Sequence, residues 1–272
     1  AIFTSQQELS AAGYAKAKRI ALSRAKAILR LETDYPSYFA VAENATDAYA
    51  IAAKGKKVVY LSIENAYPLG LDISNLREFY DLGVRMLGLV HTRNNQFADS
   101  STDLDGPKWN GLSPLGIELV REANKLGIIV DASHAHDLAL EQMISFSTTP
   151  VVLSHSGSKQ VFDHPRNVTD RLLIKLKESG GLLQMNSLGG YLGHVHVPPE
   201  RKEAFGSFVA DINELEAKGR PMSYEEFKRR RRDIDHDYPR GVSKFSDYMD
   251  HFKHVLELLG PHHVGVGADW DG

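Results

Sequence analysis

Short apolar runs rich in β-branched residues alternate with amphipathic helical segments over most of this chain. Parallel strands that are buried on both faces have continuous apolar sequences, and the crossover that joins two of them is usually a helix. The alternation therefore predicts an α/β fold in which helices cover a parallel sheet. Six runs are clear strands, at residues 57–64, 83–91, 127–134, 150–156, 181–187 and 263–269.

The segments between these runs carry recognisable helix boundaries. Pro114 occupies the first turn of one helix and Gly127 follows its last turn, the places where these residues favour helix starts and stops. Residues 5–31 predict a long helix that begins with a capping box. Residues 38–42 (YFAVA) fit either a further strand or a connection between helices.

Two architectures fit this alternation, an open sheet and a (β/α)8 barrel of the TIM type. An open sheet concentrates its site at one switch point, whereas a barrel collects side chains from the ends of many strands. Polar side chains follow several different runs here, so the barrel is favoured. No Walker sequence and no GxGxxG motif follows any run. We expect residues 1–272 to form a single barrel domain.

Charged sequence from about residue 198 to 240 interrupts the alternation and includes the run KRRRRD at 228–233. We expect this segment to be an insertion before the last strand. The arginine run is interpreted as a solvated helix face, and a contact with a substrate or partner is the alternative.

The composition narrows the class of partner. The 272 residues carry a formal net charge of -3, with 42% hydrophobic and 25% charged residues, a balance that favours neither nucleic acid nor an anionic membrane as a partner. No run approaches the roughly 18–20 apolar residues of a membrane-spanning helix. The chain opens at Ala1 with no visible signal peptide. We expect a soluble protein, and its location, periplasmic, extracellular or cytoplasmic, stays open.

Histidines and carboxylates recur at the ends of the predicted strands. His134 ends one run and His155 lies near the end of the next, about twenty residues later, so one βα repeat places the same ligand type twice. Glu64 and Asp269 put carboxylates at the ends of two other strands. In a barrel these ends meet at one rim, so the pattern predicts a shared site.

The residue types point to a metal held by nitrogen and oxygen. The chain has no cysteine, which leaves imidazole and carboxylate as ligands. Glu64 has two oxygens that could bridge two ions about 3.5–4 Å apart, an arrangement that lowers the pKa of a shared water to near 7. Asp269 is placed to move the proton of that water to a leaving amine. Asp131 is expected to orient the strand end or a ligand rather than to bind metal.

Several short sequence motifs together resemble those of the membrane dipeptidase (renal dipeptidase) family of zinc peptidases, which belong to the amidohydrolase-like barrels. These motifs occur in the same order as in the family and are spread over essentially the whole chain. They are SIEN around Glu64, LVHTRNNQFADS around His91, VDASHAHD around His134, LSHSGSKQV around His155, HPRNVTD around Arg166 and GVGADWDG around Asp269.

The resemblance implies a dipeptidase with two zinc ions per complete site. It implies that Glu64 bridges the ions and that His134 and His155 bind the second zinc. Asp269 resembles the acid/base aspartate of the family. The remaining correspondences concern the substrate: His91 resembles the histidine that polarises the scissile carbonyl, Arg166 the arginine that grips the free carboxylate, and Tyr191 a pocket residue.

One part of the family pattern is absent. The family's first strand ends in a His-x-Asp pair that holds the first zinc, and no such pair stands near Ala1. We expect the chain to be a fragment of a longer enzyme that lacks the first barrel strand. The alternative is a genuinely short protein with at most one metal ion.

The leading interpretation is therefore a metal-dependent hydrolase of dipeptides that have a free C-terminal carboxylate. A small dipeptide is the expected partner, and the resemblance also raises a homodimer. One alternative is another amide or ester hydrolase of the amidohydrolase type. A second alternative is a non-catalytic relative that serves as a binding protein.

Overall fold

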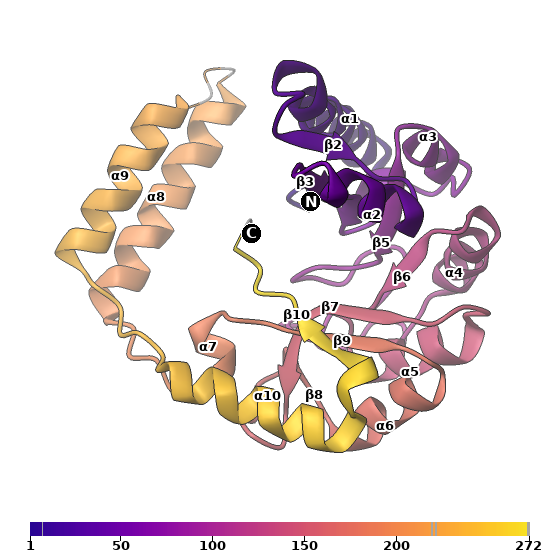
Figure 1. The fold of residues 1–272 in the computed structure, drawn as a ribbon. Helices are drawn as coiled ribbons and strands as arrows, with labels where there is room; N and C mark the ends of the chain where they lie inside the picture. The colour runs from indigo at the N-terminus through magenta and orange to yellow at the C-terminus, as the bar shows by residue number, and fades with distance from the viewer. Residues whose placement is uncertain (7, 219, 221, 271–272) are drawn as a thin grey trace.

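The computed structural model describes residues 1–6, 8–218, 220 and 222–270, and short strands alternate with helices along them. Figure 1 shows the strands gathered into a curved sheet with most helices on its outer side. The strands are β1 (Ile2–Phe3), β2 (Phe39–Val41), β3 (Lys57–Val59), β4 (Leu61–Glu64), β5 (Val84–Gly88), β6 (Ile129–Asp131), β7 (Val152–Ser158), β8 (Asn167–Val168), β9 (Leu182–Met185) and β10 (Val264–Val266).

The helices follow the strands in the expected alternation, and none within the described residues is both long and apolar enough to cross a membrane. They are α1 (Ala11–Asp34), α2 (Ala45–Ala53), α3 (Asn75–Asp81), α4 (Pro114–Leu126), α5 (Asp137–Phe146), α6 (Asp170–Glu178), α7 (Gly189–Leu192), α8 (Pro199–Ala217), α9 (Tyr224–Asp237) and α10 (Phe245–Leu259), with the 3-10 turns η1 (Tyr67–Leu69) and η2 (Pro261–His263).

The main sheet runs in the order β1-β4-β5-β6-β7-β9-β10, with β8 paired to β7, and its pairs are parallel. Along this sheet the strands follow one another in chain order, as in a barrel wall. Within the described residues no pairing joins β1 to β10, so the sheet is open between these two edges. The predicted α/β class, with a parallel sheet inside a layer of helices, is confirmed.

Helix boundaries follow local capping chemistry. The boundaries predicted for α4 are confirmed, because Ser113 caps its start through the N–H of Gly116, Pro114 opens its first turn and Gly127 ends it at φ 75°. The predicted start of the first helix at residue 5 is wrong. The α1 helix begins at Ala11, because the hydroxyl of Ser10 accepts a hydrogen bond from the N–H of Gly13 and caps that turn.

The apolar run at residues 57–64, predicted as one strand, serves two sheets. Its first half, β3, pairs with β2, and its second half, β4, joins the main sheet between β1 and β5. The exposed Tyr60 separates the two halves. Residues 38–42 therefore do contain a strand, but it lies outside the barrel sheet.

The core lies between the sheet and its outer helices. Buried strand residues such as Ile63, Leu87 and Val130 face buried helix residues such as Phe79 and Leu119 in one continuous cluster. Burial of each such side chain contributes about 1.5–3 kcal/mol relative to exposure. This continuous core fixes the strands rigidly and so fixes where their carboxyl ends meet.

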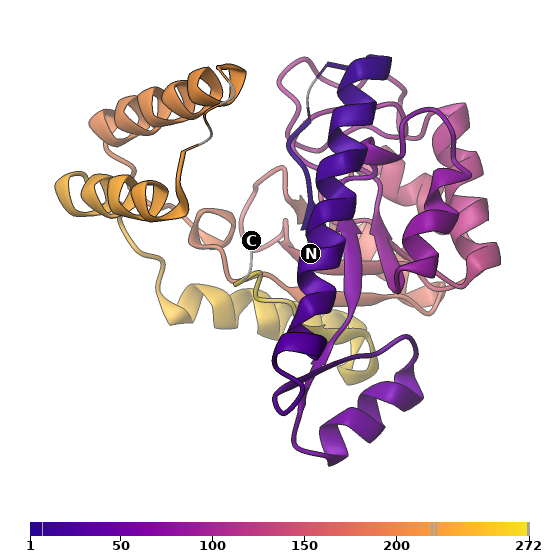
Figure 2. The ribbon, with the colours of Figure 1, turned by 90° about the horizontal axis from the view of Figure 1, so that it is seen from above.

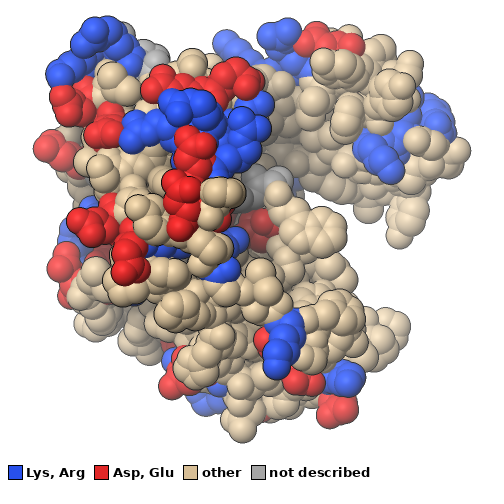
Figure 3. All heavy atoms as spheres, turned by 90° about the vertical axis from the view of Figure 1, so that its left-hand side faces the viewer, with Lys and Arg blue, Asp and Glu red and all other residues tan. Residues whose placement is uncertain are grey.

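The charged segment forms two helices, α8 and α9, that lie side by side and stand apart from the sheet in both ribbon views (Figures 1 and 2). The basic run lies on α9, where Arg229 pairs with Asp233 and Arg230 pairs with Asp211 on α8. Figure 3 looks onto this side and shows basic and acidic residues intermixed. The arginine run is thus a helix face whose charges are partly compensated by neighbouring carboxylates.

Candidate metal centre and active site

Glu64, His134 and His155 converge on one point. The Nε2 atoms of His134 and His155 lie 2.8 Å apart. Oε1 of Glu64 lies 3.1 Å from Nε2 of His134 and 3.4 Å from Nε2 of His155. Ligand atoms of a tetrahedral zinc ion, each about 2.0–2.1 Å from the metal, stand about 3.3 Å from one another. The number, type and spacing of these atoms therefore fit a divalent metal such as zinc.

Three strands of the main sheet carry these ligands. Glu64 is the last residue of β4, His155 lies within β7, and His134 follows β6 by three residues. Two strands separate β4 from β7 in the sheet order, so the curvature of the sheet brings their carboxyl ends together. His134 has φ 71°, a strained backbone for a non-glycine residue of the kind that clusters at functional sites.

The charges in this cluster favour metal ligation. Burial by itself raises the pKa of Glu64, but hydrogen bonds and charges of His134 and His155 hold that pKa well below its usual range. Burial, followed by the charge of Arg166, lowers the pKa of His134 well below the usual value. An ionised carboxylate and a neutral imidazole are the forms in which these side chains bind metal.

His155 has a second set of contacts behind the cluster. Its Nδ1 atom lies 2.7 Å from the hydroxyl oxygen of Ser154, and that hydroxyl donates to Oδ2 of Asp131. The other oxygen of Asp131 accepts hydrogen bonds from the backbone N–H groups of Ser133 and Ser154. The expectation that Asp131 orients a strand end is therefore consistent with its contacts.

His91 follows β5 and stands at the edge of the cluster. Its Nε2 atom lies 3.7 Å from Oε1 of Glu64, and its ring lies 4.1 Å from the ring of His134 and 4.7 Å from that of Phe3. Burial lowers its pKa. The backbone carbonyl of His91 accepts a hydrogen bond from the hydroxyl of Ser100, so the loop after β5 holds this histidine in place.

Buried polar side chains make that loop rigid. Asp99, fully buried, accepts hydrogen bonds from the backbone N–H groups of Lys108, Trp109 and Gly111. Asn95 bonds to Asn65 and to three backbone groups. A long connection with this many internal hydrogen bonds behaves as part of the scaffold rather than as a mobile flap.

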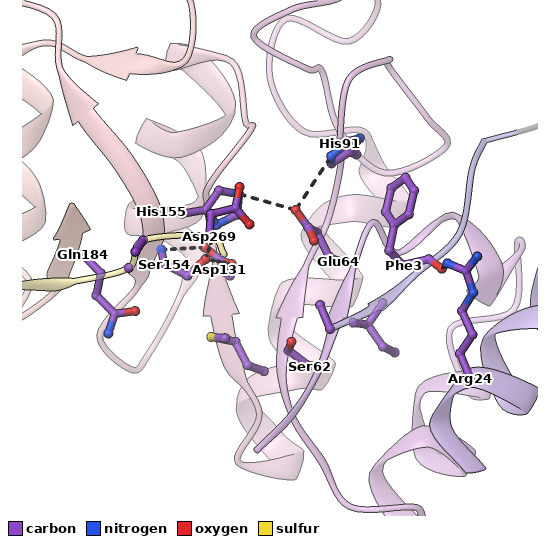
Figure 4. Close-up of a pocket in the computed structure, with 15 residues that line it drawn as sticks. Phe3, Arg24, Ser62, Glu64, His91, Asp131, Ser154, His155, Gln184 and Asp269 are labelled. Atoms are coloured by element: carbon purple, nitrogen blue, oxygen red, sulfur yellow. Dashed lines mark hydrogen bonds and ion pairs between the residues drawn. The ribbon is translucent and has the colours of Figure 1, made fainter. Parts of the chain in front are cut away.

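Asp269 and Glu64 line one cavity of about 570 Å³. Figure 4 shows both carboxylates there, together with His91 and His155. Asp269 follows β10 and has φ 62°. It reaches the cavity because the chain at Gly267 passes close to β7, where a Cβ would stand 1.8 Å from the carbonyl oxygen of Ser154. Only glycine permits this approach.

Arg166 and Tyr191 lie next to each other but are not among the residues that line this cavity. Arg166 is 3% exposed, its Nη2 atom donates to the carbonyl of His155 at 3.1 Å, and its guanidinium lies 5.4 Å from the centre of the Tyr191 ring. Its Nε atom has no hydrogen-bond partner within the described part of the chain. Burial lowers the pKa of this arginine.

The structure thus brings together Glu64, His91, His134, His155 and Asp269, and it places Arg166 with Tyr191 against the backbone of His155. Sequence reasoning missed four polar residues of the cavity: Arg24, Ser62, Ser154 and Gln184. A signal for Gln184 existed, since a polar side chain inside the apolar strand β9 has to face a polar interior. For Ser154 the only signal was its position directly before His155.

The chain is similar to known dipeptidases over most of its length. The family model for membrane dipeptidase, peptidase family M19, matches residues 1–272. An uncharacterized dipeptidase of Schizosaccharomyces pombe is 30% identical over 253 residues, which are 92% of this chain and 51% of the relative. Dipeptidase 3 of Rattus norvegicus is 27% identical over 94% of this chain and 43% of its own length. The chain spans about half the length of these curated relatives.

Solved structures show the same fold. The probable dipeptidase PvdM from Pseudomonas aeruginosa superposes with a TM-score of 0.77 at 27% identity, over 96% of this chain and 69% of the other. A metallo peptidase from Rhodobacter sphaeroides, solved with a phosphinate mimic of the dipeptide L-Ala-D-Ala, gives a TM-score of 0.73 at 26% identity, over 94% and 62%. Since the family model covers every residue, this chain belongs to the membrane dipeptidase family, peptidase family M19.

Proposed function

We propose that this chain carries the active site of a zinc-dependent dipeptidase that hydrolyses dipeptides with a free C-terminal carboxylate. The observation that carries the proposal is the convergence of Glu64, His134 and His155 within a chain of the membrane dipeptidase family. The dipeptide mimic bound to the Rhodobacter sphaeroides relative supports a substrate of this size.

Zinc is the metal that the ligand set supports best. Neutral imidazole nitrogen and carboxylate oxygen are its usual ligands where cysteine is absent. We propose two zinc ions per complete site, with Glu64 shared between them and with His134 and His155 on one of them. Bound zinc would supply Lewis acidity and a water of lowered pKa.

Arg166 is proposed to bind the carboxylate of the substrate. Within the described residues its guanidinium forms no ion pair with a carboxylate, although it is almost fully buried. Asp131 and Glu64 act on this buried guanidinium only through longer-range charge interactions, and a ligand carboxylate would satisfy its unpaired Nε–H in the forked geometry that arginine favours. The Tyr191 ring packs beside the guanidinium and is proposed to shape the pocket around it.

His91 and Asp269 are proposed to act on the scissile amide. A neutral His91 can donate an N–H to the carbonyl oxygen as negative charge develops there. Asp269, on the opposite wall of the cavity in Figure 4, can accept a proton from the attacking water and donate it to the leaving amine. The internally hydrogen-bonded loop behind His91 fixes the position of that histidine.

Four substrates test the proposal on the protein at its natural length, loaded with zinc. They are a free dipeptide, its C-terminal amide, its N-acetyl derivative and an N-acyl amino acid. We expect rapid cleavage of the free dipeptide and much slower cleavage of the amide, with about two zinc ions bound. Preference for the N-acyl amino acid would indicate another amidohydrolase activity. Zinc-loaded protein that cleaves none of them would indicate a non-catalytic relative.

A further inference from the structure

We propose that Asp131 and Ser154 are positioning residues that fix the tautomer of His155, so that its Nε2 lone pair faces the metal centre. This inference rests on the proposed metal site but concerns a different pair of side chains. In many metal sites a carboxylate holds a ligating histidine directly. Here a serine hydroxyl stands between the two groups.

The single proton of the Ser154 hydroxyl decides the tautomer. Its oxygen contacts three groups: Oδ2 of Asp131, Nδ1 of His155 at 2.7 Å and, at a longer 3.3 Å, the hydroxyl oxygen of Ser133, which has a proton of its own to donate. A carboxylate accepts hydrogen bonds and cannot donate one, so the hydroxyl proton points to Asp131. The oxygen must then accept the N–H of His155. The proton of the imidazole is therefore on Nδ1, and Nε2 carries the lone pair.

The freed lone pair faces the other ligands. Nε2 of His155 lies 2.8 Å from Nε2 of His134 and 3.4 Å from Oε1 of Glu64. With the opposite tautomer a proton would occupy the position of the metal. The hydrogen bond from Nδ1 also fixes the rotation of the ring. The side-chain entropy of this ligand is therefore lost during folding rather than on metal binding.

Asp131 holds two ligand-bearing segments at once. Its Oδ1 atom accepts the backbone N–H of Ser133 at 3.0 Å, beside His134, and that of Ser154 at 3.1 Å, beside His155. The hydroxyl of Ser133 in turn accepts the backbone N–H of His155 at 3.0 Å. These backbone bonds do not involve the Ser154 hydroxyl. A variant without that hydroxyl therefore removes its side-chain contacts, with the imidazole, with Asp131 and with the Ser133 hydroxyl, and leaves the strand ends anchored.

The chain offers a matched control on the other side of His155. Ser156 also lies in β7 and is buried, but its hydroxyl has no hydrogen-bond partner within the described residues. Ser156→Ala therefore changes the same atoms next to the same ligand without touching the proposed contact. Ser154→Thr keeps a hydroxyl at position 154 and serves as the conservative variant.

Zinc affinity, measured by competition with a chelator, is the first readout. We expect Ser154→Ala to weaken zinc binding by about 10–100-fold, the usual effect of losing an outer partner of a ligating histidine. Ser154→Thr should restore most of the affinity, and Ser156→Ala should leave it within about twofold of the wild type. Equal affinities for Ser154→Ala and the wild type would overturn the proposal.

The tautomer itself is the second readout and needs no metal. In zinc-free protein, the ¹⁵N spectrum of His155 should show a protonated Nδ1 and an unprotonated Nε2. Asp131→Asn should invert this pattern, because the asparagine N–H₂ would donate to Ser154, whose hydroxyl would then donate to Nδ1. A wild-type imidazole with its proton on Nε2 would overturn the proposal.

The two readouts separate this inference from the proposed function. If the wild type binds zinc and cleaves dipeptides while Ser154→Ala binds zinc equally well, the positioning role alone is wrong. If the wild type at its natural length binds no zinc, both the metal site and the positioning role are wrong.

Discussion

The Nε2 atoms of His134 and His155 lie 2.8 Å apart. Both histidines are almost fully buried, with exposed fractions of 6% and 8%. Two imidazole nitrogens at this distance satisfy each other only if one of them carries a proton. The carboxylate of Glu64 lies within 3.4 Å of both. Such a concentration of lone pairs is stabilised by a shared cation.

Glu64→Gln should weaken zinc binding by at least about 10–100-fold, the loss usually seen when a residue that only hydrogen-bonds a metal ligand is changed. The substitution keeps the size of the side chain and removes the anionic ligand itself. Chelator competition measures this effect. Glu141→Gln, which changes a glutamate of α5 that pairs with Arg171 and Lys175 and does not line the cavity, is the control and should bind zinc like the wild type. Unchanged zinc affinity in Glu64→Gln would exclude Glu64 as a ligand.

Asp269→Asn should lower kcat by about 10²–10⁴-fold, the usual contribution of a proton-transferring group, while the zinc content stays that of the wild type. The amide keeps the shape of the side chain but cannot take the proton of the water. Steady-state kinetics and metal analysis on the same sample check both parts. Asp163→Asn, an exposed aspartate, should retain full activity. Wild-type kcat in Asp269→Asn would rule out the proton-transfer role.

Arg166→Lys should raise KM for free dipeptides by about 10–100-fold, since a hydrogen bond to a charged group contributes roughly 1.5–3 kcal/mol and lysine lacks the fork. The C-terminal amide of the same dipeptide should be affected far less, because it presents no carboxylate. Comparing the two substrates separates the loss of the clamp from general damage to this buried position. An equal rise in KM for both substrates would contradict carboxylate binding.

Stability should fall as the pH drops below about 6.5, in part because of His251 on α10. This side chain is fully buried, its Nδ1 accepts the N–H of Ser158 at 3.0 Å and its Nε2 donates to the carbonyl of Leu192 at 3.1 Å. Burial lowers its pKa. Below the usual histidine pKa the unfolded chain takes up a proton that the folded chain refuses, so acid favours unfolding.

Urea unfolding of zinc-free protein between pH 5 and 8 measures this effect. One proton corresponds to a slope of at most about 1.4 kcal/mol per pH unit. His251→Gln should be less stable at neutral pH but should lose part of the slope, because the other histidines titrate equally in both proteins. Parallel pH profiles for the variant and the wild type would show that His251 carries no pH-dependent stability.

Much of the site could be predicted because its chemistry follows the strands. A ligand at the carboxyl end of one parallel strand lies near ligands at the ends of other strands in the same curved sheet, so Glu64, His134 and His155 were expected together before any coordinates. Arg166 was found only through the family resemblance. Nothing in local sequence indicates that this arginine is buried without a carboxylate partner.

Other features depended on contacts between distant segments. The split of residues 57–64 between two sheets follows from the pairing of β3 with β2 and of β4 with β1 and β5, which a single apolar run does not encode. The start of α1 at Ala11 was missed because Ser10 competes with earlier capping residues. The role of Ser154 was also missed, since a serine is chemically ambiguous until the partners of its hydroxyl are known.

The sequence by itself determined the α/β class, the residue types of the metal centre and the membership of the membrane dipeptidase family, because periodicity, ligand chemistry and motif order are local properties of the chain. Only the tertiary structure decided how these parts act together. The curvature of the sheet sets the spacing of the three ligands, and the buried contacts of Asp131 and Ser154 set the proton position on His155. Both depend on packing between strands far apart in sequence, where small displacements decide which atoms meet.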